Sequence, residues 1–92
     1  MSKYRIIETT RFIKETQAME KRGFDMSLLD DVVTLLKNGV KLPKTHKDHA
    51  LKGDLKGYRE CHIKNDWLLV YKIYKNDLIL LLSRTGSHSD LF

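Results

Sequence analysis

The hydrophobic positions of the first forty residues predict one short strand followed by a helix. The segment YRIIE at residues 4–8 is rich in residues that favour strands. Thr9 and Thr10 are good N-cap residues for a helix that ends at Gly23. One face of this helix is expected to carry Phe12, Thr16 and Met19.

A second helix is predicted to start at Asp25 or at Ser27, since Ser27 and Asp30 resemble a capping box. Gly39 is a natural residue for its end, and Pro43 prevents the helix from resuming. Its apolar stripe consists of Leu28, Val32, Leu35 and Leu36. We expect the two helices to form an αα-hairpin with a structural role.

The C-terminal half has the pattern of a three-stranded antiparallel meander. Residues 41–56 come first, and their lysines and glycines predict a long loop that is either functional or a solvated connector. Three segments rich in β-branched, aromatic and aliphatic residues follow: residues 58–63, 67–73 and 78–84. The tripeptide Lys-Asn-Asp separates them at residues 64–66 and again at 75–77, and both copies are expected to form hairpin turns.

Two-residue turns would set the register of this meander and would assign its two faces. Under that register Cys61 opposes Val70. The face predicted to pack on the helices consists of Cys61, Ile63, Leu68, Val70, Ile79 and Leu81. The opposite, open face consists of Glu60, His62, Leu69, Tyr71, Leu80, Leu82 and Arg84. His62 and Arg84 are therefore expected side by side, with His88 four residues further along the chain.

Composition is typical of one globular domain, here residues 1–92, with 41% hydrophobic and 32% charged residues. No apolar run reaches the length of a bilayer span, and the N-terminus lacks the apolar segment of a signal peptide. We therefore expect a cytoplasmic protein without a membrane partner. The single cysteine, Cys61, excludes an intrachain disulfide and is expected to be a small buried hydrophobe.

The basic charge is concentrated in the half of the chain that contains the histidines. The net charge of +5 favours a polyanionic partner. Residues 1–40 carry seven Lys and Arg against six Asp and Glu, whereas residues 41–92 carry ten against six. This distribution is typical of a surface that follows a phosphate backbone. The side chains expected to do so are Lys47, Lys52, Lys56, Arg59 and Lys64.

These residues suit the cleavage of RNA without a metal or cofactor. The reaction needs a base for the 2′-hydroxyl, an acid for the 5′-oxygen and positive charge at the phosphate. Imidazole can perform both proton transfers because it titrates near ~6.5. The candidates are His49, His62 and His88 for the protons, Asp66 to orient an imidazole and Arg84 for the phosphate. Unpaired bases could stack on Trp67, Phe92 or Tyr58.

Structural roles and a zinc site are the alternatives. Trp67 could be a core anchor, Arg84 could pair with Glu60, and His46 is expected to be a solvated surface residue. A zinc-dependent hydrolase would use His46, His49, His62 and Asp66. Their spacing matches no strong zinc signature, so the sequence favours metal-free acid–base catalysis.

The same motifs resemble the YafQ branch of the RelE/ParE toxin superfamily. The resemblance is dense in KDHALKGDLKGYRECHIKNDWLLVYK and LLLSRTGSHSDLF and extends in weaker form over the whole chain. It implies an α+β fold, in which two helices pack on an antiparallel sheet that the N-terminal strand joins. It also implies a ribosome-dependent endoribonuclease that cuts mRNA in the decoding site and is inhibited by a cognate antitoxin.

The resemblance also implies roles for individual residues. Catalytic positions correspond to His49, His62, Asp66 and His88, and supporting positions to Trp67, Arg84 and Phe92. His88 is the expected acid, and His49 or His62, oriented by Asp66, is the expected base. Arg84 and the remaining imidazole would stabilise the phosphorane. The ParE branch, which has a similar fold and acts on DNA gyrase, lacks this histidine set, and a binding module of that kind without catalytic activity is the alternative function.

Overall fold

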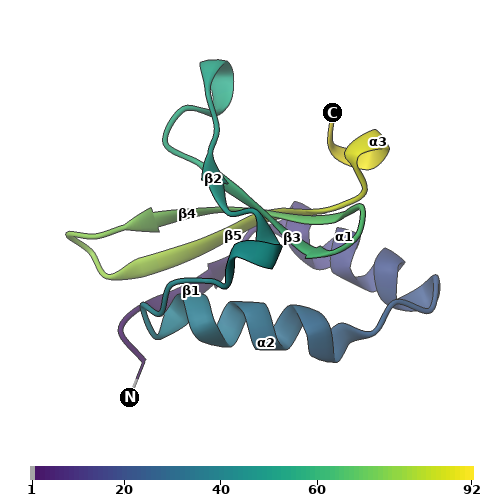
Figure 1. Cartoon of the computed structure of the whole chain (residues 1–92), viewed down its shortest axis with the longest axis horizontal. Coiled ribbons are helices and arrows are strands. Elements are labelled where there is room, and N and C mark those ends of the chain that lie inside the picture. The colour runs from purple at the N-terminus through teal and green to yellow at the C-terminus, as the bar shows by residue number, and fades with distance from the viewer. Residues whose placement is uncertain (1) are drawn as a thin grey trace.

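The structure is a computed structural model that describes residues 2–92. Its strands and helices are β1 (Arg5–Glu8), α1 (Thr10–Lys21), α2 (Met26–Lys37), β2 (His49–Ala50), β3 (Arg59–Lys64), β4 (Trp67–Tyr74), β5 (Ile79–Gly86) and α3 (His88–Leu91). Two 3₁₀ turns, η1 (Lys44–His46) and η2 (Gly53–Leu55), interrupt the predicted long loop. Figure 1 shows α1 and α2 on one side of the sheet, and α3 and the segment after β2 on the other. Among residues 2–92, none of the helices has the length and apolar character needed to cross a membrane.

Both long helices begin at side-chain caps. Thr9 precedes α1, and its Oγ1 accepts a hydrogen bond from the Phe12 backbone N–H at 2.9 Å. Asp25 precedes α2, and its Oδ1 accepts from the backbone N–H and the hydroxyl of Ser27 at 3.0 and 2.6 Å. The helix therefore starts at the earlier of the two predicted positions, and the capping box predicted for Ser27 is not formed. Gly39 follows the end of α2 with a φ of +73°, as its predicted role requires.

The five strands form one mixed sheet in the order β1-β5-β4-β3-β2. The meander is antiparallel as predicted, and the fold class is confirmed. However, β1 pairs with β5 in parallel, so the expected purely antiparallel sheet is wrong. The chain passes through both helices and two hairpins between these strands, which leaves β5 running in the direction of β1.

A bulge at the end of β3 shifts the predicted register by one residue. The pairing changes between His62 and Lys64, and Cys61 consequently opposes Leu69 instead of Val70. Because side chains alternate along a strand, the predicted faces of β4 and of β5 up to Leu82 are inverted, while those of β3 are correct. A second irregularity between Val70 and Tyr71 pairs Arg84 with Val70, so Arg84 lies on the open face as predicted. The main core contains Cys61, Ile63, Leu69, Tyr71, Leu80 and Leu82 and lacks Leu68, Val70, Ile79 and Leu81.

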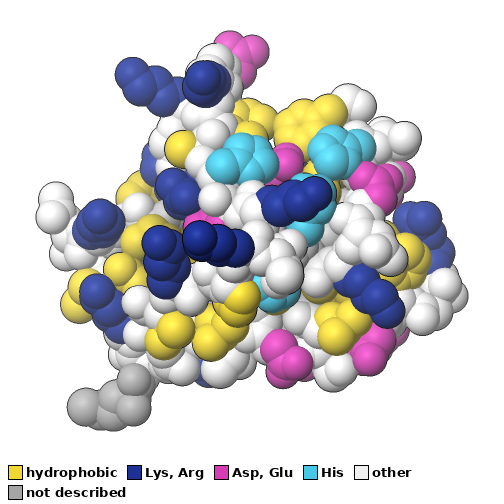
Figure 2. All heavy atoms as spheres, in the orientation of Figure 1, with side chains coloured by type: hydrophobic (Ala, Val, Ile, Leu, Met, Phe, Trp, Pro, Cys, Tyr) yellow, Lys and Arg dark blue, Asp and Glu magenta, His cyan; other side chains and the backbone are white. Residues whose placement is uncertain are grey.

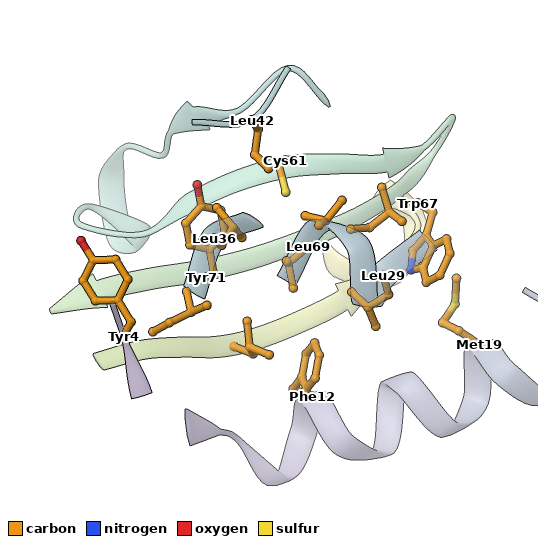
Figure 3. Packing of buried hydrophobic residues seen from close by; sticks show 14 residues of the cluster. Tyr4, Phe12, Met19, Leu29, Leu36, Leu42, Cys61, Trp67, Leu69 and Tyr71 are labelled. Carbon is orange, nitrogen blue, oxygen red and sulfur yellow. The ribbon is translucent and has the colours of Figure 1, made fainter. Parts of the chain in front are cut away.

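Both long helices contribute side chains to the core that lies between them and the sheet. Figure 3 shows Phe12 and Met19 of α1 and Leu29 of α2 among side chains of β4, including Leu69. On the opposite face, Leu68 and Val70 form a smaller cluster with Leu91 of α3. This second cluster holds the C-terminal helix against the sheet.

Trp67 lies at the end of the main core and is only 2% exposed. Its indole Nε1–H donates to Thr85 Oγ1 at 2.9 Å, and the Thr85 hydroxyl donates to the Leu68 carbonyl at 2.7 Å. Phe24 packs edge-on against the indole, with ring centroids 5.3 Å apart. The structure therefore favours the core-anchor alternative for Trp67 over a stacking platform.

Replacement of this anchor should lower stability more than catalysis. Trp67→Phe removes the bond to Thr85 and part of the buried volume, and we expect a loss of about 1–3 kcal/mol in the free energy of unfolding. Urea denaturation would measure it, with the exposed Val40→Ala variant as a control that should change by less than about 0.5 kcal/mol. An unchanged midpoint together with lost activity would indicate a direct role in the reaction instead.

Candidate active site

The open face of the sheet brings together His62 from β3, Asp66 from the following turn, and His88 and Phe92 from the C-terminal segment. The imidazole rings of His62 and His88 lie 6.0 Å apart between centroids, and those of His88 and Phe92 lie 6.3 Å apart. The Phe92 side chain is 62% exposed, so its ring is accessible. We call these four residues the histidine cluster. Figure 2 shows histidine side chains gathered on this side of the molecule among lysines and arginines.

Asp66 fixes the orientation of His88. Its Oδ1 lies 2.6 Å from His88 Nδ1 and also accepts from the His88 backbone N–H at 3.3 Å. These hydrogen bonds stabilise the carboxylate and hold the pKa of Asp66 below its ordinary value. Since a carboxylate only accepts, Nδ1 carries the proton and Nε2 is left for the substrate.

The same turn orients His62. The backbone carbonyl of Asn65 lies 2.8 Å from His62 Nδ1, and a carbonyl also only accepts, which again leaves Nε2 for the substrate. Asn65 has a φ of +50°, a left-handed conformation that asparagine tolerates better than most residues. The prediction that Asp66 orients the base does not match this geometry, because Asp66 contacts His88, the predicted acid.

His49 lies on the edge strand β2 and is half exposed. Its Nδ1 is 2.7 Å from the Lys47 carbonyl, and its Nε2 is 3.6 Å from Oε1 of Glu60. Glu60 is only 4% exposed and lies two residues before His62 on the same face of β3. The sequence placed Glu60 on this face but assigned it no role in the site; the alternation Glu60-Cys61-His62 was the available signal.

A polar cluster behind His49 holds the loop that carries it. The Tyr71 hydroxyl donates to Asp48 Oδ1 at 2.5 Å, and Arg59 donates to both Asp48 oxygens at 3.3 and 3.2 Å. The bond to Asp48 raises the pKa of Arg59, while burial and the nearby Asp48 carboxylate raise that of Tyr71. Arg59 is therefore bound to Asp48. The sequence had suggested that Arg59 contacts an RNA backbone as a free cation, and this pairing does not support that role.

Arg84 is bound by Glu15 of α1. The shortest contact, from a terminal guanidinium nitrogen to Oε2, is 2.6 Å, and Nε lies 3.2 Å from the same oxygen. The guanidinium also donates to the backbone carbonyls of Asp90 and Leu91 at 3.3 and 3.4 Å. The sequence suggested Glu60 as a carboxylate partner of Arg84, and the partner in the structure is Glu15. Arg84 thus connects α1 to the end of α3 and fixes the segment that carries His88.

The remaining candidates lie on the segment from η1 to the β3–β4 turn. Lys52 and Lys56 flank η2 on the segment that projects from the sheet in Figure 1, and Tyr58 at its base is half-buried beneath the Lys72 ammonium group. Lys47 and Lys64 are exposed. His46, expected to be solvated, is half-buried because η1 packs on β3, where its Nδ1 lies 2.7 Å from the His62 carbonyl.

Possible metal ligands and the one cysteine also bear on the chemistry of the site. Within residues 2–92, no group of three His, Cys, Asp or Glu side chains is arranged to hold a metal ion. Cys61 is fully buried as predicted, and burial raises the pKa of its thiol to about 12. A thiol with this pKa is not ionised near neutral pH.

Comparison with known proteins shows the family to which the chain belongs. Residues 4–92 match the model of the family of bacterial toxins of type II toxin-antitoxin systems, YafQ. The chain belongs to this family. The mRNA interferase toxin YafQ of Escherichia coli is 42% identical over 83 residues, which cover 89% of this chain and 88% of that protein.

Solved structures extend the similarity to the whole fold. YafQ in the crystal structure of the E. coli DinJ–YafQ toxin-antitoxin complex has a TM-score of 0.89 at 40% identity, and the match covers 98% of each chain. A metal-bound toxin from Helicobacter pylori has a TM-score of 0.91 at 47% identity, covering 97% of this chain and 99% of that one. The family indicated by the sequence motifs is thus confirmed.

The cluster around Asp48 should act on catalysis by positioning His49. Tyr71→Phe removes one donor to Asp48, and we expect the single-turnover cleavage rate to fall about 10-fold with little change in KM, because small displacements of a reacting group are costly. The exposed Tyr74→Phe on the same strand is the matched control. If Tyr71→Phe lowered only thermal stability and left the cleavage rate unchanged, Tyr71 would be purely structural.

Proposed function

We propose that this chain is a toxin that cleaves translated mRNA on the ribosome, with His62 as base and His88 as acid and without a metal ion. The observation that carries the proposal is the pair of imidazoles 6.0 Å apart, each held through Nδ1 by the same turn. Within residues 2–92 neither Nε2 atom has a hydrogen-bond partner, so both are available to substrate. The name of the E. coli relative, an mRNA interferase, supports the same reaction.

The proposed reaction is a transesterification within the RNA. His62 Nε2 accepts the proton of the 2′-hydroxyl, the 2′-oxygen bonds to phosphorus, and the bond from phosphorus to the 5′-oxygen breaks. His88 acts in its imidazolium form, with a proton on each nitrogen, and its Nε2–H donates to the departing oxygen, which gives a 2′,3′-cyclic phosphate and a free 5′-hydroxyl. Asp66 holds the second nitrogen of His88 throughout. The exposed ring of Phe92 offers a face for a base beside the scissile phosphate.

Charge around the cluster would attract and hold the RNA. Lys47, Lys52, Lys56 and Lys64 are exposed, and we assign them to contacts with mRNA or ribosomal RNA in the decoding site. His49 lies beside the buried carboxylate of Glu60. There it can act as a positively charged group at the phosphate or as an alternative base. In this geometry Arg84 acts by positioning α3, because Glu15 occupies its guanidinium.

We also infer a cognate antitoxin as partner. The solved complex of the E. coli relative with DinJ supports a protein of this type. The net charge of +5 favours an acidic segment that covers the basic face. Such a complex would form in the cytoplasm, where the mRNA substrate is translated.

The role of His88 can be separated from that of His62 by changing the leaving group. His88→Ala should reduce single-turnover cleavage of a short ribosome-bound mRNA by about 10²–10⁴-fold. Replacing the bridging 5′-oxygen by sulfur should restore much of the rate, because a thiolate leaves without protonation. His62→Ala is the matched control and should remain slow with both substrates.

If the sulfur substrate restored the rate of neither variant, the assignment of His88 as acid would be refuted. Unchanged toxicity of a folded His88→Ala variant would do the same. Growth arrest without discrete mRNA ends in primer extension would instead support a binding module that blocks translation without cutting.

Metal independence needs its own test, since the H. pylori relative was solved with bound metal. We expect purified protein treated with EDTA and exchanged into metal-free buffer to cleave a ribosome-bound message at its full rate. Loss of cleavage that zinc restores would favour the zinc alternative over imidazole acid–base catalysis.

A further inference from the structure

A groove of about 540 Å³ adjoins the histidine cluster at Asp66, and the reaction described above does not use it. It lies between the α1–α2 connection and the β3–β4 turn. Two of its lining residues are next to His88: Asp66 accepts the hydrogen bonds from His88, and Ser87 precedes His88 in the chain. Its volume is within the range of small-ligand sites.

The lining combines an aromatic floor with polar and cationic groups. Phe24 is half-buried in the floor, with its ring packed edge-on against Trp67. The guanidinium carbon of Arg22 lies 5.2 Å from the centre of the Phe24 ring, and its Nη1 lies 3.4 Å from Asp90 Oδ2. Lys64 and Asn65 also line the groove. Phenyl rings and guanidinium planes are the surfaces on which proteins stack unpaired bases.

We propose that this groove binds the base of a nucleotide next to the scissile phosphate. The inference rests on the proposed function, because an RNA strand whose phosphate lies between His62 and His88 must continue past the β3–β4 turn. Asp66 lines the groove and also holds His88, so a nucleotide in the groove is continuous with the reacting phosphate. The Arg22 guanidinium, which lies over the Phe24 ring, would stack the base, and Lys64 would contact its phosphate.

The free polar atoms of the groove provide sequence selectivity. Asp25 Oδ1 caps α2 through Ser27, which leaves its Oδ2 for an amino group of a base, and the Asn65 side-chain amide can both donate and accept. Both residues line the groove, where the edge of a base stacked on Arg22 would lie. The groove would therefore contribute to the choice of cleavage site as well as to affinity.

An abasic scan tests the groove against the intact enzyme. A series of ribosome-bound mRNAs, each with one abasic nucleotide near the cleavage site, is cleaved by the unmodified chain and by the Phe24→Leu and Arg22→Gln variants. At one flanking position the abasic nucleotide should raise KM about 10-fold for the unmodified chain, the effect of one lost stacking contact. The groove variants should show a similar rise in KM on intact mRNA and no further rise with that abasic nucleotide. Lys21→Gln, a neighbouring exposed cation outside the groove, is the matched control.

The outcomes separate this inference from the proposed function. No cleavage of any mRNA by the unmodified chain would refute the proposed function itself. Normal cleavage in which every abasic nucleotide changes KM equally for the unmodified chain and for the groove variants would refute the binding of a base in the groove, and would leave the proposed function intact. Variants that cleave normally but lose binding of the purified antitoxin would assign the groove to that protein, and this result also overturns the inference. Circular dichroism of each variant confirms that Phe24→Leu remains folded.

Discussion

The arrangement of the site depends on two hydrogen bonds from one turn. The Asn65 carbonyl holds Nδ1 of His62 at 2.8 Å, and the Asp66 carboxylate holds Nδ1 of His88 at 2.6 Å. Adjacent residues therefore select the same nitrogen on two imidazoles that are 26 positions apart in the sequence. The bulge that ends β3 brings these two acceptors into place, since it shifts the pairing between His62 and Lys64.

The second half of the site is held by contacts from distant elements. Helix α3 spans only His88–Leu91, too short to be stable alone, so its position depends on tertiary contacts. Leu91 packs on Leu68 and Val70, and Arg84 donates to the carbonyls at the end of α3 while Glu15 holds its guanidinium. Glu15 also accepts a hydrogen bond from the Thr85 backbone N–H at 3.3 Å, beyond the point where β1 stops pairing with β5. The Glu15 carboxylate thus accepts from a backbone N–H at the edge of β5 and also fixes Arg84, which supports the segment that carries His88.

Local signals in the sequence were sufficient for β1, the two long helices and the meander and for much of the cluster, but β2 and α3 were not predicted. The caps at Thr9 and Asp25 and the strand composition located the helices and the meander, and the face of His62 was correct because it followed from β3 alone. The bulge could not be predicted, because it depends on how the turn packs rather than on the residue types of Lys64-Asn65-Asp66. It inverted the faces of β4 and of β5 up to Leu82, so the core positions of Leu69 and Tyr71 were missed. The partners Glu15 and Asp48 were missed for a related reason, since each pair joins residues from separate elements and no spacing encodes it.

The two sides of the sheet explain why a wrong register still led to the correct cluster. Face inversion exchanged one set of aliphatic residues in β4 and β5 for another, and both sets can form a core. In β3, however, the choice was between Cys61 and Ile63 on one face and Glu60 and His62 on the other, and only the apolar pair can be buried against two helices without a large desolvation cost. The polar face of β3 was therefore fixed by chemistry, independently of the turn geometry. Because α3 packs on the same side as His62, through the apolar cluster of Leu68 and Val70, the residues that the register misplaced are the ones that bring His88 to its partner.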